Sequence, residues 1–157
     1  MPYRIVFVCL GNICRSPIAE IVMRRLVRTA GLEDRIAVES GGTGDWHLGE
    51  PADPRTLDVL RRNGYDGSAH RARQFTPQWF DEHDLVVAMD DSNLTALRRM
   101  APPDARDKIR LLLSFDPDAA QSEVPDPYYG GADGFDDVLA MIEQACRALL
   151  EQVKTEL

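Results

Sequence analysis

Short apolar runs alternate with amphipathic segments along the whole chain, and this alternation constrains the fold more than any other feature. The apolar runs are rich in β-branched and aromatic residues, which favour buried strands. We predict strands at residues 3–8, 35–40, 85–89 and 109–113. We predict helices from residue 16, at 53–63, at 92–100 and near the C-terminus. This order predicts βαβ units, so we expect an α/β fold: a single domain over residues 1–157, with an open, parallel, four-stranded sheet flanked by helices on both faces.

Local signals predict the ends of several elements. Ser16 is placed to be the N-cap of the first helix, and Pro17 to be its first residue. Residues 41–44 are predicted to be a glycine-rich loop, and residues 116–133 a loop rich in Pro and Asp. The buried stripe predicted for the first helix is Ile18, Ile21, Val22 and Leu26. The buried face predicted for the last helix is Phe135, Val138, Leu139, Ile142, Cys146, Leu149 and Val153.

Composition limits the compartment and the partners. Three cysteines, Cys9, Cys14 and Cys146, are an odd and sparse set, which predicts a reducing, cytoplasmic compartment and not a disulfide framework. The N-terminal stretch lacks the features of a signal peptide, and no apolar run approaches the roughly 20 residues of a membrane span. Residues 81–157 carry 7 Lys and Arg against 17 Asp and Glu. We therefore expect no membrane and no nucleic-acid partner.

The segment Cys-Leu-Gly-Asn-Ile-Cys-Arg-Ser, from Cys9 to Ser16, lies between the first predicted strand and helix. A loop in this position can turn successive backbone N–H groups inward to bind an anion. Gly11 permits a positive φ, and Asn12 tolerates the left-handed region. The positive field favours the thiolate form of Cys9, and a hydrogen bond from Ser16 would stabilise it further. Arg15 adds a planar fork that can bind two phosphate oxygens.

Each of these residues alone has an ordinary structural explanation, but the joint pattern C-x5-R-S at a strand–helix junction predicts a phosphate site with a cysteine nucleophile. Other phosphate and nucleotide motifs are missing from the sequence: it has neither G-x-x-x-x-G-K-[ST] nor G-x-G-x-x-G. Cys9 and Cys14 have no further Cys or His at metal-binding spacing. We therefore predict no metal and no cofactor.

Asp126 is the candidate general acid. Attack of a thiolate on a phosphoester needs a proton for the departing oxygen. Asp126 lies between two prolines in the long loop after the fourth predicted strand, on the side where the Cys9 loop should open. Taken alone, the stretch is better explained as an ordinary Pro/Asp turn. Beside the Cys9 loop it predicts a catalytic acid, and Tyr128 and Tyr129 are placed to line a slot for an aromatic ring.

With both motifs in view, the chain resembles the low-molecular-weight protein tyrosine phosphatases over nearly its whole length. The motifs that carry the likeness are VCLGNICRSP at 8–17, DWH at 45–47, DPR at 53–55, HRARQ at 70–74, MDDSNL at 89–94 and DPYY at 126–129. The resemblance implies hydrolysis of phosphotyrosine in proteins, and of small aryl phosphates, through a phosphocysteine intermediate.

The resemblance also implies a role for each matching residue. Cys9 is then the nucleophile, Arg15 the phosphate clamp, and Asp126 the general acid and later the base for water. The phosphate-binding loop consists of Leu10, Gly11, Asn12, Ile13, Cys14 and Ser16. The polar network that supports the loop consists of Asn12, Ser16, Ser40 and His70. The walls around the substrate ring are Leu10, Ile13, Trp46, Tyr128 and Tyr129. No role follows for His47.

Three other activities are compatible with such a loop. Arsenate reduction usually needs a downstream cysteine pair, and residues 70–100 contain no cysteine. Protein arginine phosphatases, to which the chain is also similar, carry a small Thr where this chain has Ile13, and their acid loop lacks the double tyrosine. A bulky Ile13 favours a phenyl ring, and hence phosphotyrosine. A phosphate-binding module without turnover is the remaining alternative.

The expected partners follow from the resemblance. They are phosphotyrosine proteins as substrates, inorganic phosphate and other oxyanions as competitive ligands, and, for the chain itself, a monomer or weak self-association. Cys14 has two interpretations: it packs inside the loop, or under oxidant it forms a disulfide with Cys9 that protects the nucleophile. The resemblance favours the redox interpretation.

Overall fold

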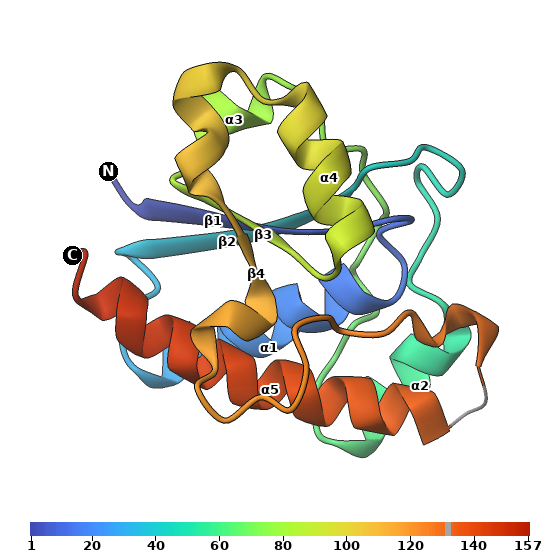
Figure 1. The fold of residues 1–157 in the computed structure, drawn as a ribbon. Helices are drawn as coiled ribbons and strands as arrows, with labels where there is room; N and C mark the ends of the chain where they lie inside the picture. The colour runs from blue at the N-terminus through green and yellow to red at the C-terminus, as the bar shows by residue number, and fades with distance from the viewer. Residues whose placement is uncertain (131–132) are drawn as a thin grey trace.

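Four parallel strands form one sheet at the centre of the molecule, in the order β2-β1-β3-β4. The computed structural model describes residues 1–130 and 133–157. The strands are β1 (Tyr3–Cys9), β2 (Ile36–Gly42), β3 (Leu85–Ala88) and β4 (Ile109–Leu111). In this order β1 lies in the interior of the sheet, between β2 and β3 (Figure 1). The predicted α/β fold is confirmed.

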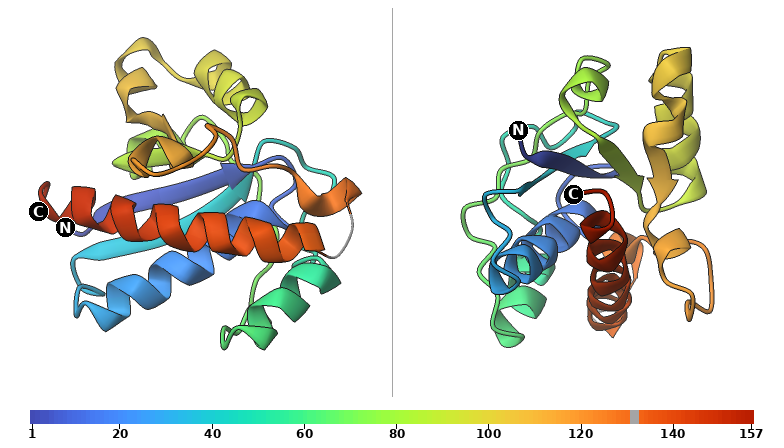
Figure 2. Two further views of the ribbon diagram at one scale, coloured as in Figure 1. Left: turned by 60° about the horizontal axis from the view of Figure 1, so that its bottom comes forward. Right: turned by 90° about the vertical axis from the view of Figure 1, so that its left-hand side faces the viewer.

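Helices cover both faces of the sheet (Figure 2). The first face carries α1 (Arg15–Thr29), α2 (Pro54–Arg62) and α5 (Asp133–Lys154), and the second carries α3 (Trp79–Glu82), α4 (Asp91–Met100) and η1 (Pro103–Lys108). Side chains of β1 alternate between these two layers: Ile5 and Phe7 belong to the first core, Val6 and Val8 to the second. The short 3-10 turns η2 (Leu112–Phe115) and η3 (Pro127–Tyr129) complete the elements.

The prediction that Ser16 caps the first helix is wrong. Helix α1 begins at Arg15, and its N-cap residue is Cys14, whose side chain makes no capping bond. Ser16 lies inside the first turn, because its hydroxyl group is engaged by Cys9 and Asn12 and not by the helix backbone. The capping preference of serine is thus overridden by contacts within the loop.

The last residue of every strand also differs from the prediction, by one residue for β1 and β3 and by two for β2 and β4. Strand β2 continues to Gly42, because Gly41 and Gly42 pair with Val8 and Cys9 of β1. Strand β4 ends at Leu111, and the next two residues of the predicted strand belong to η2. The turns α3, η1 and η3 were not predicted. Residues 131 and 132 of the predicted loop 116–133 lie outside the described residues.

The order of the strands determines where a ligand can enter. Strands β1 and β3 are neighbours, but the chain leaves β1 towards β2 and leaves β3 towards β4. In open α/β sheets a crevice forms at such a switch point, beyond the carboxyl ends of the strands. Here Cys9 ends β1, and Asp90 follows β3 as the N-cap of α4. Among the helices described for this chain, none is long and apolar enough to cross a membrane.

Candidate active site

The loop from Cys9 to Arg15 connects β1 with α1 at this switch point. Asn12 adopts the positive φ of 57° that the sequence pattern predicts for a tight anion-binding turn. The loop backbone lies directly against β2: a Cβ atom at Gly42 would be 2.8 Å from the Leu10 carbonyl oxygen. Only glycine permits this approach at residue 42. The Gly44 N–H then donates to the same Leu10 carbonyl at 2.9 Å, which fixes the start of the loop.

A polar network holds the loop from within. The Ser16 hydroxyl oxygen lies 2.9 Å from the Cys9 sulfur. The Asn12 side-chain amide donates to the Ser16 oxygen at 2.8 Å and to the Ser40 oxygen at 3.0 Å. The His70 Nε2 atom lies 2.7 Å from the Asn12 carbonyl oxygen. The structure therefore brings together the four residues to which the resemblance gave a supporting role, around the sulfur of Cys9.

Arg15 is the buried cation of the site, with only 2% of its surface exposed. Its Nη1 group donates to Asp90 Oδ2 at 2.6 Å and to the Val124 carbonyl at 2.9 Å, and its Nη2 group lies 3.6 Å from Asp126 Oδ2. Burial alone would lower the pKa of Arg15, but the charges of Cys9 and Asp90 outweigh burial and raise it. The guanidinium group thus stays charged and oriented, as an oxyanion clamp requires.

The Asp90 contact was missed by sequence reasoning, although Asp90 lies in the motif at 89–94. The available signal was its position: it directly follows a buried strand that neighbours β1 in the sheet. Because β1 and β3 are parallel neighbours, an acidic side chain just after β3 lies close to a cation in the segment just after β1. The same argument finds the Val124 carbonyl, because the Val124 N–H donates to the Met89 carbonyl at the end of β3.

Asp126 faces the site from the opposite wall. Its Oδ1 atom accepts a hydrogen bond from the Tyr128 N–H at 3.0 Å and so caps η3, which leaves Oδ2 directed towards Arg15. About 30% of the side chain is exposed, so the carboxyl group can reach both a bound ester and solvent water. This is the arrangement that a residue acting first as an acid and then as a base needs.

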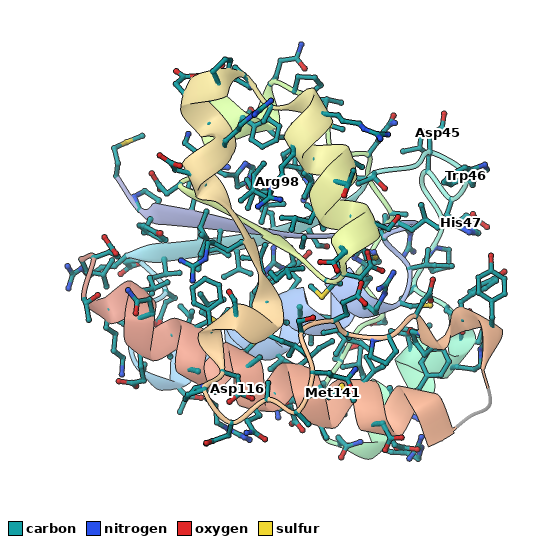
Figure 3. The ribbon with its side chains drawn as sticks, in the orientation of Figure 1. Asp45, Trp46, His47, Arg98, Asp116 and Met141 are labelled. Atoms are coloured by element: carbon teal, nitrogen blue, oxygen red, sulfur yellow. The ribbon has the colours of Figure 1, made fainter. Side chains whose placement is uncertain are left out.

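A cavity of about 350 Å³ opens above the loop. Its walls include aromatic side chains that project into solvent: Trp46 is 70% exposed and Tyr129 is 84% exposed. Figure 3 labels Asp45, Trp46 and His47 on the loop that follows β2, at the same end of the molecule as η3. The residues that line the cavity are Cys9, Leu10, Gly11, Ile13, Cys14, Arg15, Trp46, His47, Asp126, Tyr128 and Tyr129.

His47 is a wall residue to which the sequence assigned no role. Its ring covers the phosphate loop so closely that a Cβ atom at Gly11 would lie 2.9 Å from His47 Cδ2. Its Nδ1 atom lies 2.7 Å from Glu50 Oε2, and its ring centroid is 6.4 Å from that of Tyr128 across the mouth. The signal available in the sequence was the position of His47 next to Trp46, which was already predicted to line the cavity.

Cys14 is the second buried cysteine of the loop. Burial raises the pKa of the Cys14 thiol to about 12, with nearby Asp53 adding to the shift. Cys14 is therefore a neutral thiol at physiological pH and does not compete as a nucleophile. Both cysteines are free thiols in this structure, so the disulfide between them stays a prediction. Within residues 1–130 and 133–157, no three His, Cys, Asp or Glu side chains are grouped so as to bind a metal ion.

A thiol at the centre of an anion-binding loop, with a buried arginine and a facing carboxyl group, defines the class of cysteine-dependent phosphatases. The comparisons with known proteins agree with this class. The model of the low molecular weight phosphotyrosine protein phosphatase family matches residues 4–157. The chain belongs to this family, and it is an enzyme that hydrolyses phosphotyrosine.

Individual relatives resemble the chain along its whole length. A low molecular weight protein-tyrosine-phosphatase of Streptomyces coelicolor is 54% identical over 160 residues, which cover 99% of this chain and 96% of the relative. The crystal structure of a protein tyrosine phosphatase from Entamoeba histolytica superposes with a TM-score of 0.95, at 36% identity and 98% coverage of both chains. A structure named as a Drosophila arginine phosphatase has a TM-score of 0.88, at 34% identity, and covers 96% of this chain and 97% of that one.

Proposed function

We propose that Cys9, Arg15 and Asp126 carry out the hydrolysis in two steps, through a phosphocysteine on Cys9. The observation that supports this proposal is that the three side chains, from β1, α1 and the loop before η3, line one cavity of about 350 Å³. Their chemistry is complementary: a nucleophile, a cation for the phosphoryl oxygens and a proton donor.

In the first step the Cys9 thiolate attacks phosphorus in line with the ester oxygen. The S–P bond forms, the P–O bond to the tyrosine ring breaks, and protonated Asp126 gives its proton to the departing phenolate oxygen. Arg15 and the inward-facing N–H groups of the loop bind the equatorial oxygens, on which negative charge remains throughout. The apolar walls contact the ring of the substrate.

In the second step a water molecule replaces the sulfur. Asp126, now a carboxylate, takes a proton from this water as its oxygen bonds to phosphorus and the S–P bond breaks. Inorganic phosphate then leaves, and the Cys9 thiolate is restored. Because product phosphate and substrate use the same anion site, we expect phosphate and other oxyanions to inhibit competitively.

The substrate preference can be measured with a phosphopeptide panel in the presence of a chelator. We expect phosphotyrosine to be hydrolysed with a kcat/KM about 10²-fold or more above that for phosphoserine or phosphoarginine. The reason is that Ile13, Trp46 and the two tyrosines line the cavity with surface that matches a phenyl ring. Preference for phosphoarginine, the activity named for the Drosophila relative, would contradict this use of Ile13, and binding without turnover would identify a phosphate-binding module.

The acid role of Asp126 predicts a dependence on the leaving group. In Asp126→Asn we expect kcat for phosphotyrosine to fall about 10²- to 10³-fold, and kcat for an aryl phosphate with an acidic phenol to fall much less, because such a phenolate departs without a proton. The measurement is kcat against the acidity of the phenol for both enzymes. Asp137→Asn, an exposed change of the same charge on α5, is the matched control. Equal losses for all leaving groups would argue against the acid role.

The compartment and the assembly are also part of the proposal. The odd, sparse set of three cysteines supports a reducing, cytoplasmic location, since both Cys9 and Cys14 function or pack as free thiols. The exposed aromatic side chains around the mouth support substrate contact there, with weak self-association as a second use of the same surface.

A further inference from the structure

Glu20 lies at one end of a continuous chain of hydrogen bonds whose other end is the sulfur of Cys9. The Ser40 hydroxyl donates to Glu20 Oε1 at 2.5 Å. Ser40 accepts from the Asn12 amide at 3.0 Å, and the same amide donates to Ser16 at 2.8 Å. Ser16 in turn lies 2.9 Å from Cys9. The sequence did not single out Glu20, which looks like one more acid on an amphipathic helix.

The carboxylate of Glu20 is fixed in place and nearly buried, with 8% of the residue exposed. Its second oxygen pairs with Arg24 Nη2 at 3.0 Å, one turn further along α1. Arg24 is itself tied to β2, because its Nε and Nη2 groups donate to the Val38 carbonyl at 3.1 and 2.9 Å. A charge is retained at such a depth only when both oxygens are satisfied, as they are here.

The direction of the hydrogen bonds in this chain is determined by groups that can only donate or only accept. The Arg73 backbone N–H donates to Asn12 Oδ1 at 2.9 Å, so the NH₂ group of Asn12 must face the two serines. Ser40 therefore accepts from Asn12 and needs an acceptor for its own hydrogen. A carboxylate supplies one. Ser16 accepts the other Asn12 hydrogen, which leaves its own hydrogen available for the sulfur of Cys9.

We infer that Glu20 is a positioning residue for the nucleophile: it accepts the Ser40 hydrogen and so holds Asn12 in the orientation that directs the Ser16 hydroxyl onto Cys9. This inference rests on the proposed role of Cys9. A hydrogen bond to a thiolate stabilises the charged form of the sulfur and orients it for attack. Glu20 never touches the substrate, and its effect reaches Cys9 through three other side chains.

Glu20→Gln is the sharpest test, because it preserves the shape of the side chain and replaces one acceptor with a donor. Arg24 requires an acceptor, so the Gln oxygen faces Arg24 and the Gln NH₂ group faces Ser40. Ser40 then meets two donors and loses its acceptor. We expect kcat/KM for phosphotyrosine to fall about tenfold, and alkylation of Cys9 by iodoacetamide to reach half its maximal rate at a pH about one unit higher.

The alkylation readout separates this inference from the proposed function, since it reports on Cys9 without turnover. Glu33→Gln, an exposed change of the same charge, is the control and should leave both values unchanged. Ser40→Ala should shift the alkylation profile in the same direction, and adding Glu20→Gln to Ser40→Ala should shift it no further. The inference is overturned if Glu20→Gln keeps the wild-type alkylation profile, or if its shift is as large in the Ser40→Ala background. Should Glu20→Gln not fold, a wild-type profile in Ser40→Ala overturns it as well.

Discussion

Cys9→Ser should abolish the hydrolysis of phosphotyrosine, with kcat lower by about 10⁴-fold or more. A serine hydroxyl is protonated at neutral pH, and the groups around it are not placed to take its proton: we infer that Ser16 donates, Arg15 is a cation, and Asp126 must itself be protonated for the first step. The variant should still fold, because the change removes only the larger sulfur atom at a site held by hydrogen bonds. It should also still bind phosphotyrosine, since the loop N–H groups and Arg15 remain.

The measurement is single-turnover phosphate release together with binding of a phosphotyrosine peptide. Cys146→Ala is the matched control: Cys146 is buried in α5, away from the cavity lining, and this variant should keep its turnover apart from any loss of stability. In the wild type, rapid acid quench should trap a phosphate adduct on the peptide that contains Cys9. Substantial turnover by Cys9→Ser, or an adduct on Cys14, would contradict the assignment of the nucleophile.

The fold was predictable because its signals are local. Each strand is a short apolar run, and the seven residues predicted to form the buried face of the last helix are all buried in α5. The order of the strands was not predictable in the same way. It depends on which strands pair, and the pairing of β1 with β3 joins segments about 80 residues apart along the chain.

The same distinction between local and long-range signals applies to the residues of the active site. The loop from Cys9 to Ser16 is contiguous, so its chemistry can be inferred from the types of residue and their spacing. Asp90 meets Arg15 across 75 residues, and Glu20 reaches Ser40 through the packing of α1 against β2. Neither contact can be found without knowing which strands and helices are neighbours in the fold. The capping prediction for Ser16 failed for a related reason, because its hydroxyl group contacts Cys9 and Asn12 in the loop and not the backbone of the helix.

The uneven charge of the chain acquires a meaning once the fold is known. The acidic residues 81–157 supply Asp90 and Asp126, the two acidic side chains beside Arg15. Residues 1–80 supply Arg15 and the loop. The two halves therefore meet at the carboxyl ends of β1 and β3, where charge compensation makes a buried guanidinium group stable.

Arg15→Lys should lower kcat/KM by about 10³-fold while the protein remains folded. In the wild type, Nη1 is engaged by Asp90 and the Val124 carbonyl, whereas Nε and Nη2 make no hydrogen bond with any described residue and can bind two phosphoryl oxygens. A lysine has one ammonium group at the same place. The lysine can neutralise Asp90 or contact the phosphoryl group, but it lacks the planar guanidinium group that binds Asp90 and two phosphoryl oxygens at once.

Arg15→Ala separates the catalytic role of this residue from its structural role. Removing the cation leaves Asp90 partly buried and uncompensated, so we expect the free energy of unfolding, measured in urea, to fall by about 3 kcal/mol. Arg15→Lys should retain most of this stability, because its charge still faces Asp90. The two variants should therefore differ widely in stability and little in turnover. If Arg15→Lys keeps near wild-type turnover, the positive charge alone is sufficient and the bidentate clamp is wrong. If both variants unfold at the same urea concentration as the wild type, the ion pair with Asp90 contributes nothing to the fold and serves only to orient the guanidinium group.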